Sequence, residues 1–217
     1  MIKAVIFDLD GLLIDSEPFW RQVEIDMLHQ LGIHATEEMV RQTYGLRTDE
    51  VIKYWYDFQP WPDPDYRKLE ADFYIRIQDL INGADILMEG AREAVMMVRS
   101  GGYLSAIASS SPLIMIDNFV KRYSLTGSFD LIHSSYEEAF GKPHPAVYLS
   151  TAKKLGVPPT SCLAIEDSIN GIIAAKAARM KTIVIPDPAN FEDKHYVIAD
   201  GNLHSLKDLT LELIQSL

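Results

Sequence analysis

The sequence has little cysteine and a shortage of basic residues. Cys162 is the one cysteine among 217 residues, so the chain cannot form an internal disulfide and is not a disulfide-stapled scaffold. Lys and Arg together number 20 against 31 Asp and Glu, which gives a formal net charge of −11. Because nucleic-acid binding relies on clustered Lys and Arg, this balance argues against a nucleic-acid partner and against binding to a membrane surface.

Long apolar runs are missing as well. No run approaches the roughly 20 residues that a transmembrane helix needs. The apolar stretch of residues 1–7 ends at Asp8, which is too early for a signal peptide. Cys162 lies in an apolar context, so we expect it to be a small core residue rather than a reactive thiol. These absences predict a globular, cytoplasmic protein, and we expect it to be a monomer.

What the sequence does contain is an alternation of short apolar runs and helical patterns. Hydrophobic residues make up 47% of the chain, enough for a stable core. Apolar runs without polar alternation are typical of strands buried on both faces of a parallel sheet. The expected strands are residues 3–7, 103–108, 162–165 and 182–185, with 129–133 as a weaker fifth, and the expected helices are residues 91–100, 112–123, 145–155 and 170–178. This alternation predicts an α/β fold with a doubly wound, mostly parallel sheet of the Rossmann-like kind.

Residues 16–83 break the alternation. They contain four helical stretches with no convincing strand between them, at residues 18–31, 36–43, 48–58 and 65–81. An insert that directly follows the first strand would lie over the carboxyl ends of the strands, where open α/β folds bind their ligands. We therefore expect an α/β core of residues 1–15 and 84–217 with an inserted four-helix cap of residues 16–83.

Two carboxylates follow the first expected strand, in the sequence Asp8-Leu9-Asp10-Gly11. Acids two residues apart at a strand tip can both face one site, as a nucleophile or metal ligand and its acid/base partner must. A turn or a helix cap would use the same residues, so the pattern alone is weak.

Hydroxyl groups and a lysine follow in neighbouring loops. Ser109, Ser110 and Ser111 come after the second expected strand, where hydroxyl and backbone donors can hold a phosphate. The alternative is an N-cap for the next helix, which we expect for Ser111 in any case. Lys142 lies between a glycine and a proline, so its backbone is stiff while its ammonium can point inward, although an isolated lysine is more often solvated.

Two more acids, Glu166 and Asp167, end the strand that begins at residue 162. Carboxylates at the tip of a buried strand need a cation to offset the cost of leaving water. A hard metal such as Mg²⁺ is the natural partner for such oxygen ligands.

These motifs, in this order, resemble the four motifs of the haloacid dehalogenase superfamily of phosphohydrolases. The helical segment after the first motif is similar to the small helical cap of that superfamily. Within it, the chain most resembles bacterial sugar-phosphate phosphatases. The stretches that carry this likeness are residues 7–18, 45–47, 54–56 and 166–171.

The resemblance implies a role for each catalytic residue. Asp8 would attack phosphorus and form an aspartyl phosphate. Asp10 would protonate the departing sugar oxygen and then take a proton from the attacking water. Ser109 would bind a phosphoryl oxygen with help from Ser110, and Lys142 would neutralise charge on Asp8 and on the transferring group.

The resemblance also implies a metal and a substrate class. Mg²⁺ would be held by Asp8, the backbone carbonyl of Asp10 and Asp167, with Glu166 close by or acting through water. The partner would be a small sugar or sugar-alcohol phosphate, such as 2-deoxyglucose 6-phosphate or a hexitol phosphate.

Three residues are expected to contact the substrate itself: Ser110, Trp20 and Arg47. Arg47 follows Gly45 in the cap and is the cap cation that we expect to recognise the substrate. A solvated helix N-terminus explains Arg47 equally well.

Two alternatives remain open. A phosphosugar mutase of the β-phosphoglucomutase kind resembles the chain in all four motifs, but it carries a His where Trp20 falls. After the serine motif such mutases carry a Lys-Asn pair that grips a second phosphate, and here the residues are Pro112 and Leu113. A non-catalytic module on the same scaffold would be suggested by the loss of Asp8 or Asp10, and both are present.

Overall fold

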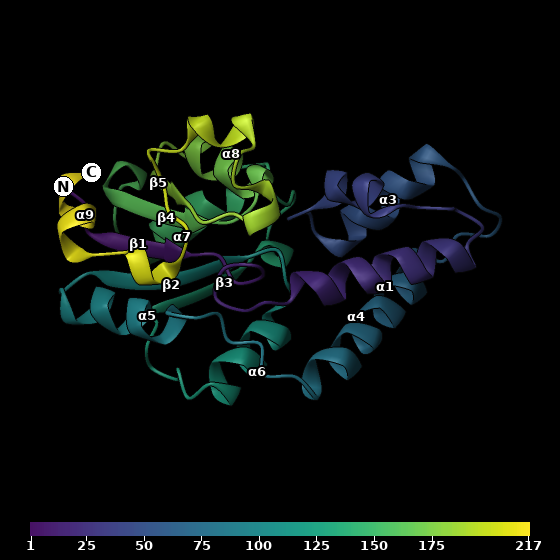
Figure 1. The fold of residues 1–217 in the computed structure, drawn as a ribbon, viewed down its shortest axis with the longest axis horizontal. Helices are drawn as coiled ribbons and strands as arrows, with labels where there is room; N and C mark the ends of the chain where they lie inside the picture. The colour runs from purple at the N-terminus through teal and green to yellow at the C-terminus, as the bar shows by residue number, and fades with distance from the viewer.

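The computed structural model describes residues 1–217, and its centre is a six-stranded sheet (Figure 1). The strand order is β3-β2-β1-β4-β5-β6, and each neighbouring pair is parallel. The strands are β1 (Ala4–Phe7), β2 (Leu104–Ser109), β3 (Leu131–Ser134), β4 (Cys162–Glu166), β5 (Lys181–Val184) and β6 (Gly201–Asn202). The predicted doubly wound parallel sheet is therefore confirmed, and the five expected strands lie within two residues of their predicted bounds.

The two faces of the sheet bury different side chains because successive residues of a strand point to opposite sides. Val5 and Phe7 of β1 belong to a large apolar cluster on one face, whereas Ala4 and Ile6 belong to a smaller cluster on the other. All four are fully buried. The smaller cluster is rich in alanine, which lets its covering helices lie close to the sheet.

Helices cover both faces. The larger cluster includes residues of α5 (Ala91–Ser100), α6 (Leu113–Arg122) and α9 (Leu211–Ser216). The smaller cluster includes residues of α7 (Ala146–Leu155) and α8 (Ile169–Ala177). The four helices predicted between strands are all present, and α9 near the C-terminus was not predicted.

Four further helices form a unit beside the α/β core, beyond the ends of the strands (Figure 1). They are α1 (Glu17–Gln30), α2 (Glu37–Val40), α3 (Thr48–Phe58) and α4 (Tyr66–Asn82). The predicted stretch 36–43 divides into α2 and a short 3₁₀ turn, Arg41–Thr43. We call this unit, α1 to α4, the cap.

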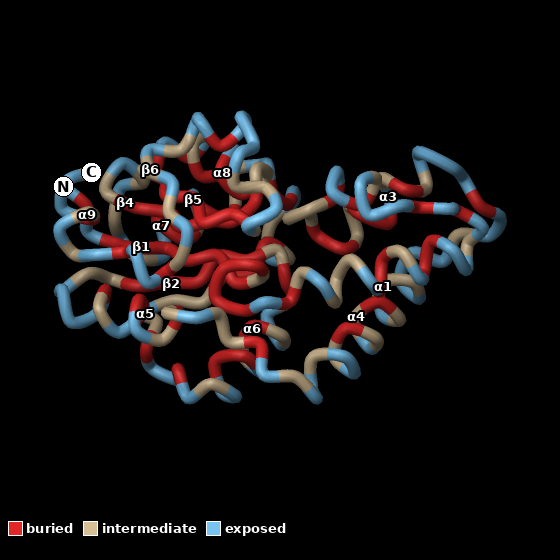
Figure 2. Tube along the Cα trace, viewed as in Figure 1, coloured by how far each residue is buried: buried red, intermediate tan, exposed pale blue.

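The cap has a small apolar interior of its own, and Figure 2 shows buried segments in both units. Trp55 and Trp61 lie in it, so these aromatic side chains pack within the cap. Glu24 is buried there too, and its Oε1 accepts hydrogen bonds from Thr43 Oγ1 at 2.7 Å and from Trp55 Nε1 at 2.6 Å. Burial raises the pKa of Glu24 to about 7.

None of the helices combines the length and the hydrophobicity that crossing a membrane would require.

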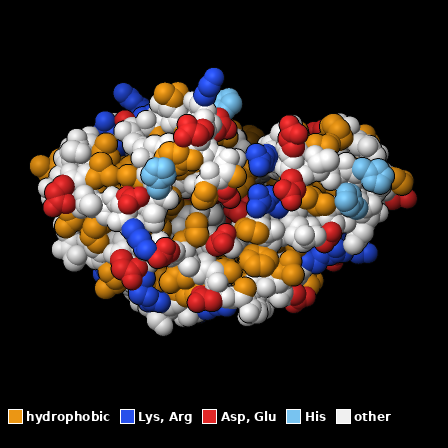
Figure 3. Space-filling view, viewed as in Figure 1, with side chains coloured by type: hydrophobic (Ala, Val, Ile, Leu, Met, Phe, Trp, Pro, Cys, Tyr) orange, Lys and Arg blue, Asp and Glu red, His pale blue; other side chains and the backbone are white.

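Cys162 is fully buried at the start of β4, which confirms it as a core residue, and burial raises the pKa of its thiol to about 11. On the face shown in Figure 3, Lys and Arg side chains are scattered among Asp and Glu rather than gathered in one patch.

Candidate active site

The carboxyl ends of three central strands meet at one edge of the sheet. Phe7 of β1 pairs with Ile107 of β2 on one side and with Ile165 of β4 on the other. The residues that follow these pairs are therefore neighbours. The chain builds β1, β2 and β3 toward one edge and then β4, β5 and β6 toward the other, so this is the point where the winding reverses and where such folds bind ligands.

Lys142 lies at the centre of this edge and is 1% exposed. Its ammonium donates to Asp8 Oδ1 at 2.7 Å, to Glu166 Oε1 at 2.6 Å and to the carbonyl oxygen of Ala108 at 3.1 Å. A lysine has three N–H donors, so each one has a partner. Burial alone would lower the pKa of Lys142, but Asp8 and Glu166 raise it above its usual value, so the side chain stays charged.

Asp8, Glu166 and Asp167 form a buried acidic cluster in which one oxygen from each lies within 4.8 Å of the others. Burial raises the pKa of Asp8 to about 8, and the charge on Glu166 adds to the rise. Burial and the charges on Asp8 and Glu166 raise the pKa of Asp167 as well. Three carboxylates beside one ammonium leave excess negative charge, and buried charge requires a counter-charge.

The acidic cluster fits a hard divalent cation. Asp167 Oδ1 is buried and has no hydrogen-bond partner, so an acceptor is left over where the cluster needs positive charge. Carboxylate oxygens are the ligands that Mg²⁺ takes in proteins. The predicted ligands Asp8, Glu166 and Asp167 are thus brought together, whereas the side chain of Asp10 is outside the cluster.

The carboxylate of Asp10 instead lies against the first helix of the cap and the loop before α6. Its Oδ1 accepts hydrogen bonds from Ser16 Oγ at 2.7 Å and from Trp20 Nε1 at 3.0 Å. Its Oδ2 accepts from Ser111 Oγ at 2.7 Å. Trp20 was predicted to contact the substrate, and here its indole holds Asp10. Ser111 does not cap α6, whose first turn follows Pro112 without a side-chain cap, so that expectation was wrong.

A small space, which we call the reaction chamber, lies between the acidic cluster and Asp10. Its volume is about 40 Å³. The chamber is lined by Asp8, Asp10, Trp20, Gly45, Leu46, Thr48, Ser110, Ser111 and Asp167. Five of the predicted site residues therefore border one space. Ser109 is fully buried beside it, and its Oγ accepts from the backbone N–H of Ser111 at 2.9 Å.

Arg47 is not brought to the reaction chamber. Its guanidinium donates to both carboxylate oxygens of Asp49 at 2.9 Å and to the carbonyl oxygens of Ser135 and Glu138 at 2.9 Å. Arg47 is 7% exposed, so it is not a solvated helix terminus either. Because α3 begins next to a loop of the core, Arg47 joins the cap to that loop, where its donors are already satisfied.

Two glycines make room for the acids, and sequence reasoning did not assign them a role. A Cβ at Gly11 would lie 1.8 Å from Asp167 Oδ2, and the φ of Gly11 is +77°. A Cβ at Gly171 would lie 2.0 Å from the carboxyl carbon of Glu166. Each glycine follows an acid pair in the sequence, which is the signal that could have found it.

Tyrosines and a serine at the site were also missed. Tyr44 donates to Asp167 Oδ2 and Tyr148 donates to Glu166 Oε1, while Tyr196 donates to the carbonyl oxygen of Asp167 at 3.0 Å. Ser16 donates to Asp10. The three tyrosines come from the cap, α7 and a 3₁₀ turn, so no local sequence pattern connects them with the acids.

Comparisons with known proteins identify a family and several relatives of this chain. Residues 2–179 match the family of haloacid dehalogenase-like hydrolases. The chain is 44% identical over 210 residues to hexitol phosphatase B of Escherichia coli K12, covering 96% of this chain and 95% of that protein. The structure resembles CbbY from Rhodobacter sphaeroides in complex with phosphate, with a TM-score of 0.86 and 26% identity over 99% of this chain and 100% of that one. A β-phosphoglucomutase from Clostridium difficile shares the fold, with a TM-score of 0.86 and 23% identity over 100% of this chain and 96% of that one.

Proposed function

The chain belongs to the haloacid dehalogenase-like hydrolases, and we propose that it is a Mg²⁺-dependent phosphatase of small sugar or sugar-alcohol monophosphates. The observation that carries the proposal is the reaction chamber, with Asp8 in a buried cluster on one side and Asp10 on the other. The identity to hexitol phosphatase B over nearly the whole of both chains supports the substrate class.

The reaction proceeds in two displacements. In the first, a carboxylate oxygen of Asp8 bonds to phosphorus while the bond from phosphorus to the sugar oxygen breaks, and Asp10 gives its proton to that oxygen. In the second, water bonds to phosphorus, Asp10 takes a proton from the water, and the bond to Asp8 breaks to release inorganic phosphate. A hydroxyl can donate or accept, so Ser16 and Ser111 can serve Asp10 in both protonation states.

Charge is the main obstacle to this attack. A carboxylate about 4 Å from one phosphate charge is repelled by about 1 kcal/mol in water and about 4 kcal/mol at an effective dielectric of about 20. Lys142 touches Asp8 and carries one positive charge to the reacting group. Asp8 and Asp167, with the backbone carbonyl of Asp10 and with Glu166 beside them, would hold Mg²⁺, whose charge would offset the remaining repulsion.

A phosphosugar mutase is the alternative on this fold. Trp20 lies at the position of the mutase His, and its indole N–H donates a hydrogen bond to Asp10. Pro112 and Leu113 supply no side-chain donor for a second phosphate. A non-catalytic module is disfavoured because Asp8 and Asp10 are both present and both line the reaction chamber. We further propose that the protein acts in the cytoplasm as a monomer.

The test is phosphate release from a panel of 2-deoxyglucose 6-phosphate, sorbitol 6-phosphate, mannitol 1-phosphate and glucose 6-phosphate. We expect release from several of these in the presence of Mg²⁺. A parallel incubation with β-glucose 1-phosphate and a bisphosphate primer tests the mutase. Accumulation of glucose 6-phosphate without free phosphate would replace hydrolysis by isomerisation, and inertness toward the whole panel would favour the non-catalytic module.

A further inference from the structure

The reaction chamber is too small for a whole sugar phosphate. About 10–15 Å³ of such space holds one water, so a chamber of about 40 Å³ admits roughly three or four water-sized groups. That suffices for a phosphoryl group but not for six carbons with their hydroxyls. The part of the substrate that leaves must therefore occupy an adjoining space.

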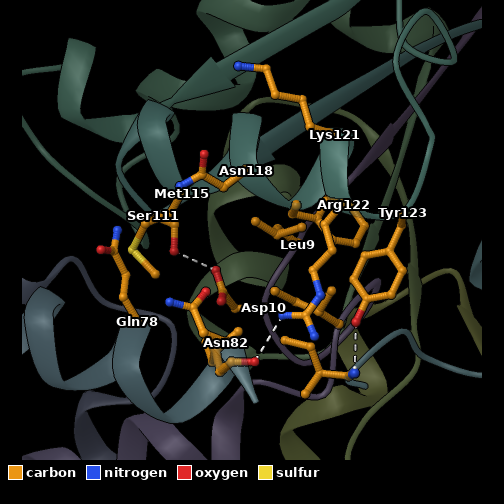
Figure 4. A pocket seen from close by; sticks show the side chains of 14 residues that line it. Leu9, Asp10, Gln78, Asn82, Ser111, Met115, Asn118, Lys121, Arg122 and Tyr123 are labelled. Atoms are coloured by element: carbon orange, nitrogen blue, oxygen red, sulfur yellow. Dashed lines mark hydrogen bonds between the residues drawn. The ribbon is translucent and has the colours of Figure 1, made fainter. Parts of the chain in front are cut away.

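A much larger cavity lies between α4 of the cap and α6 of the core (Figure 4). Its volume is about 480 Å³, within the range of about 300–1,000 Å³ that is usual for small-molecule sites. Asp10 and Ser111 line both this cavity and the reaction chamber. A leaving oxygen that receives its proton from Asp10 therefore stands at the boundary between the two spaces.

The polar side chains of the cavity suit hydroxyl groups. Gln78 and Asn82 on α4 and Asn118 on α6 line it, and no hydrogen bond joins their carboxamides to other groups of the protein. A carboxamide both donates and accepts, as a hydroxyl does, so these three groups are free to bind a polyol. Leu9 and Phe119 add apolar wall for its carbon chain.

The same cavity offers little to a second phosphate. Arg122 lines it, but its guanidinium donates to the carbonyl oxygens of Ile81, at 2.9 Å, and Ala84. Lys121 also lines it, and Figure 4 shows its ammonium directed away from Asp10. The cavity therefore fits an uncharged, hydroxyl-rich group rather than an anionic one.

A second adjoining cavity, of about 170 Å³, is less suitable. It shares Trp20, Gly45, Leu46 and Thr48 with the reaction chamber, but Asp10 does not line it. Its charged lining is mostly acidic, with Glu17, Glu24, Asp187 and Asp193 against Arg21 and Arg41. A leaving oxygen directed there would lie away from its proton donor.

We propose that the cavity between α4 and α6 receives the uncharged polyol part of the substrate and that Gln78 and Asn118 bind its hydroxyls. The inference rests on the proposed phosphatase function, since it takes the leaving oxygen to be at Asp10. It assigns a binding site to the part of the substrate that leaves, and it names the residues that bind that part.

The test compares two substrates in the same variants. Sorbitol 6-phosphate offers hydroxyls to the cavity, whereas 4-nitrophenyl phosphate offers a flat ring with none on its carbons. In the double variant Gln78→Ala/Asn118→Ala, the ratio of kcat/KM for sorbitol 6-phosphate to that for 4-nitrophenyl phosphate should fall about tenfold, through KM, because two neutral hydrogen bonds are lost. Asn190→Ala removes a carboxamide from the 170 Å³ cavity and should leave the ratio as it is.

A variant that fills the cavity with a larger side chain provides a second measurement of the same ratio. Met115→Trp should obstruct the cavity and lower the same ratio, and the residual hydrolysis reports on folding. An unchanged ratio in both the double and the filling variants, with wild-type hydrolysis present, overturns this inference and leaves the phosphatase proposal standing. A ratio that falls for Asn190→Ala instead overturns it in favour of the other cavity. Absence of hydrolysis of any substrate by the wild type overturns the phosphatase proposal and this inference with it.

Discussion

The two sides of Asp10 are built in different ways. On the side of the sheet, Asp8, Lys142 and Glu166 are buried, and each N–H of the lysine has a fixed acceptor. On the side of α4 and α6, Asn82 and Asn118 are exposed and their carboxamides make no hydrogen bond to the protein. The difference indicates that the two sides of Asp10 have different functions. Charge chemistry needs groups that are held in place before the substrate arrives, whereas recognition of hydroxyls can use side chains that adjust.

We expect the largest effect from a substitution in the buried charge cluster on the sheet side of Asp10. Lys142→Met leaves Asp8 and Glu166 buried without their ammonium, and removing one partner of a buried ion pair costs about 3–5 kcal/mol. We expect a loss of stability of that order in urea unfolding, together with loss of phosphate release. Lys153→Met, at an exposed position of α7, is the matched control and should unfold like the wild type. Equal unfolding midpoints for the two variants would contradict a pre-formed charge cluster.

A change at the edge of the acidic cluster should have the next largest effect. Gly11→Ala combines a φ of +77° with a Cβ only 1.8 Å from Asp167 Oδ2, so we expect a loss of about 2–3 kcal/mol and weaker Mg²⁺ binding. Gly32→Ala has the same backbone strain, with a φ of +80°, but nothing within 4 Å of its Cβ. It should cost about 1–2 kcal/mol and leave Mg²⁺ binding unchanged. Thermal melts and Mg²⁺ titrations separate the two, and equal Mg²⁺ affinity in both variants would speak against Asp167 as a ligand.

The cap contains a buried acid of its own, Glu24. Its protonation makes the stability of the folded chain depend on pH. Burial raises the pKa of Glu24 from 4.5 to about 7, so the folded cap binds this proton more tightly than the unfolded chain does. The contribution of Glu24 to stability is therefore most favourable below about pH 4.5 and is lost as the pH rises to about 7, by up to about 3 kcal/mol. Glu24→Gln stays neutral and keeps an acceptor for Thr43 and Trp55.

Urea unfolding at several pH values checks this prediction. Relative to the wild type, Glu24→Gln should gain stability above about pH 7 and gain little near pH 5. Glu192→Gln, at an exposed position, is the control and should show no such trend. A Glu24→Gln variant whose stability follows the wild type across this range would show that Glu24 is not held protonated.

The smallest effect is expected where the cap meets Asp10. Trp20→Phe removes the indole donor to Asp10 Oδ1 but keeps an aromatic ring beside Phe73. Loss of one hydrogen bond of about 1 kcal/mol should lower kcat by roughly threefold to tenfold, since Asp10 loses a donor that positions it. Trp61→Phe removes an indole that makes no hydrogen bond and should leave kcat unchanged. An unchanged kcat in Trp20→Phe would show that the Trp20 indole contributes packing alone.

The sequence predicted the buried charge cluster on the sheet side of Asp10 better than it predicted the side of α4 and α6. Strand β1 and the acids after it were recognisable because an apolar run ends abruptly in Asp8, and Lys142 because Gly141 and Pro143 frame it. Strand β6 was missed because two residues, one of them glycine, make no apolar run. These features depend on residues that are adjacent in the sequence. They can therefore be recognised, or missed, without knowledge of the fold.

Contacts between distant segments could not be predicted in the same way. Arg47 was expected at the substrate, yet its partners Ser135 and Glu138 lie about ninety residues away along the chain. Ser16 and Tyr44 became part of the site only when the cap was placed against the core. Such partners depend on the orientation of the cap, which hydrophobic periodicity does not specify.

The most direct test of the account is phosphate release from sorbitol 6-phosphate by the wild type and by Asp8→Asn, with Mg²⁺ and with an excess of chelator. Asp117→Asn, on α6 and with a carboxylate that makes no hydrogen bond in the structure, is the matched control. We expect release by the wild type and by Asp117→Asn only when Mg²⁺ is present, and a loss of about a thousandfold or more in Asp8→Asn. Full activity of Asp8→Asn, or of the wild type in excess chelator, would contradict this expectation.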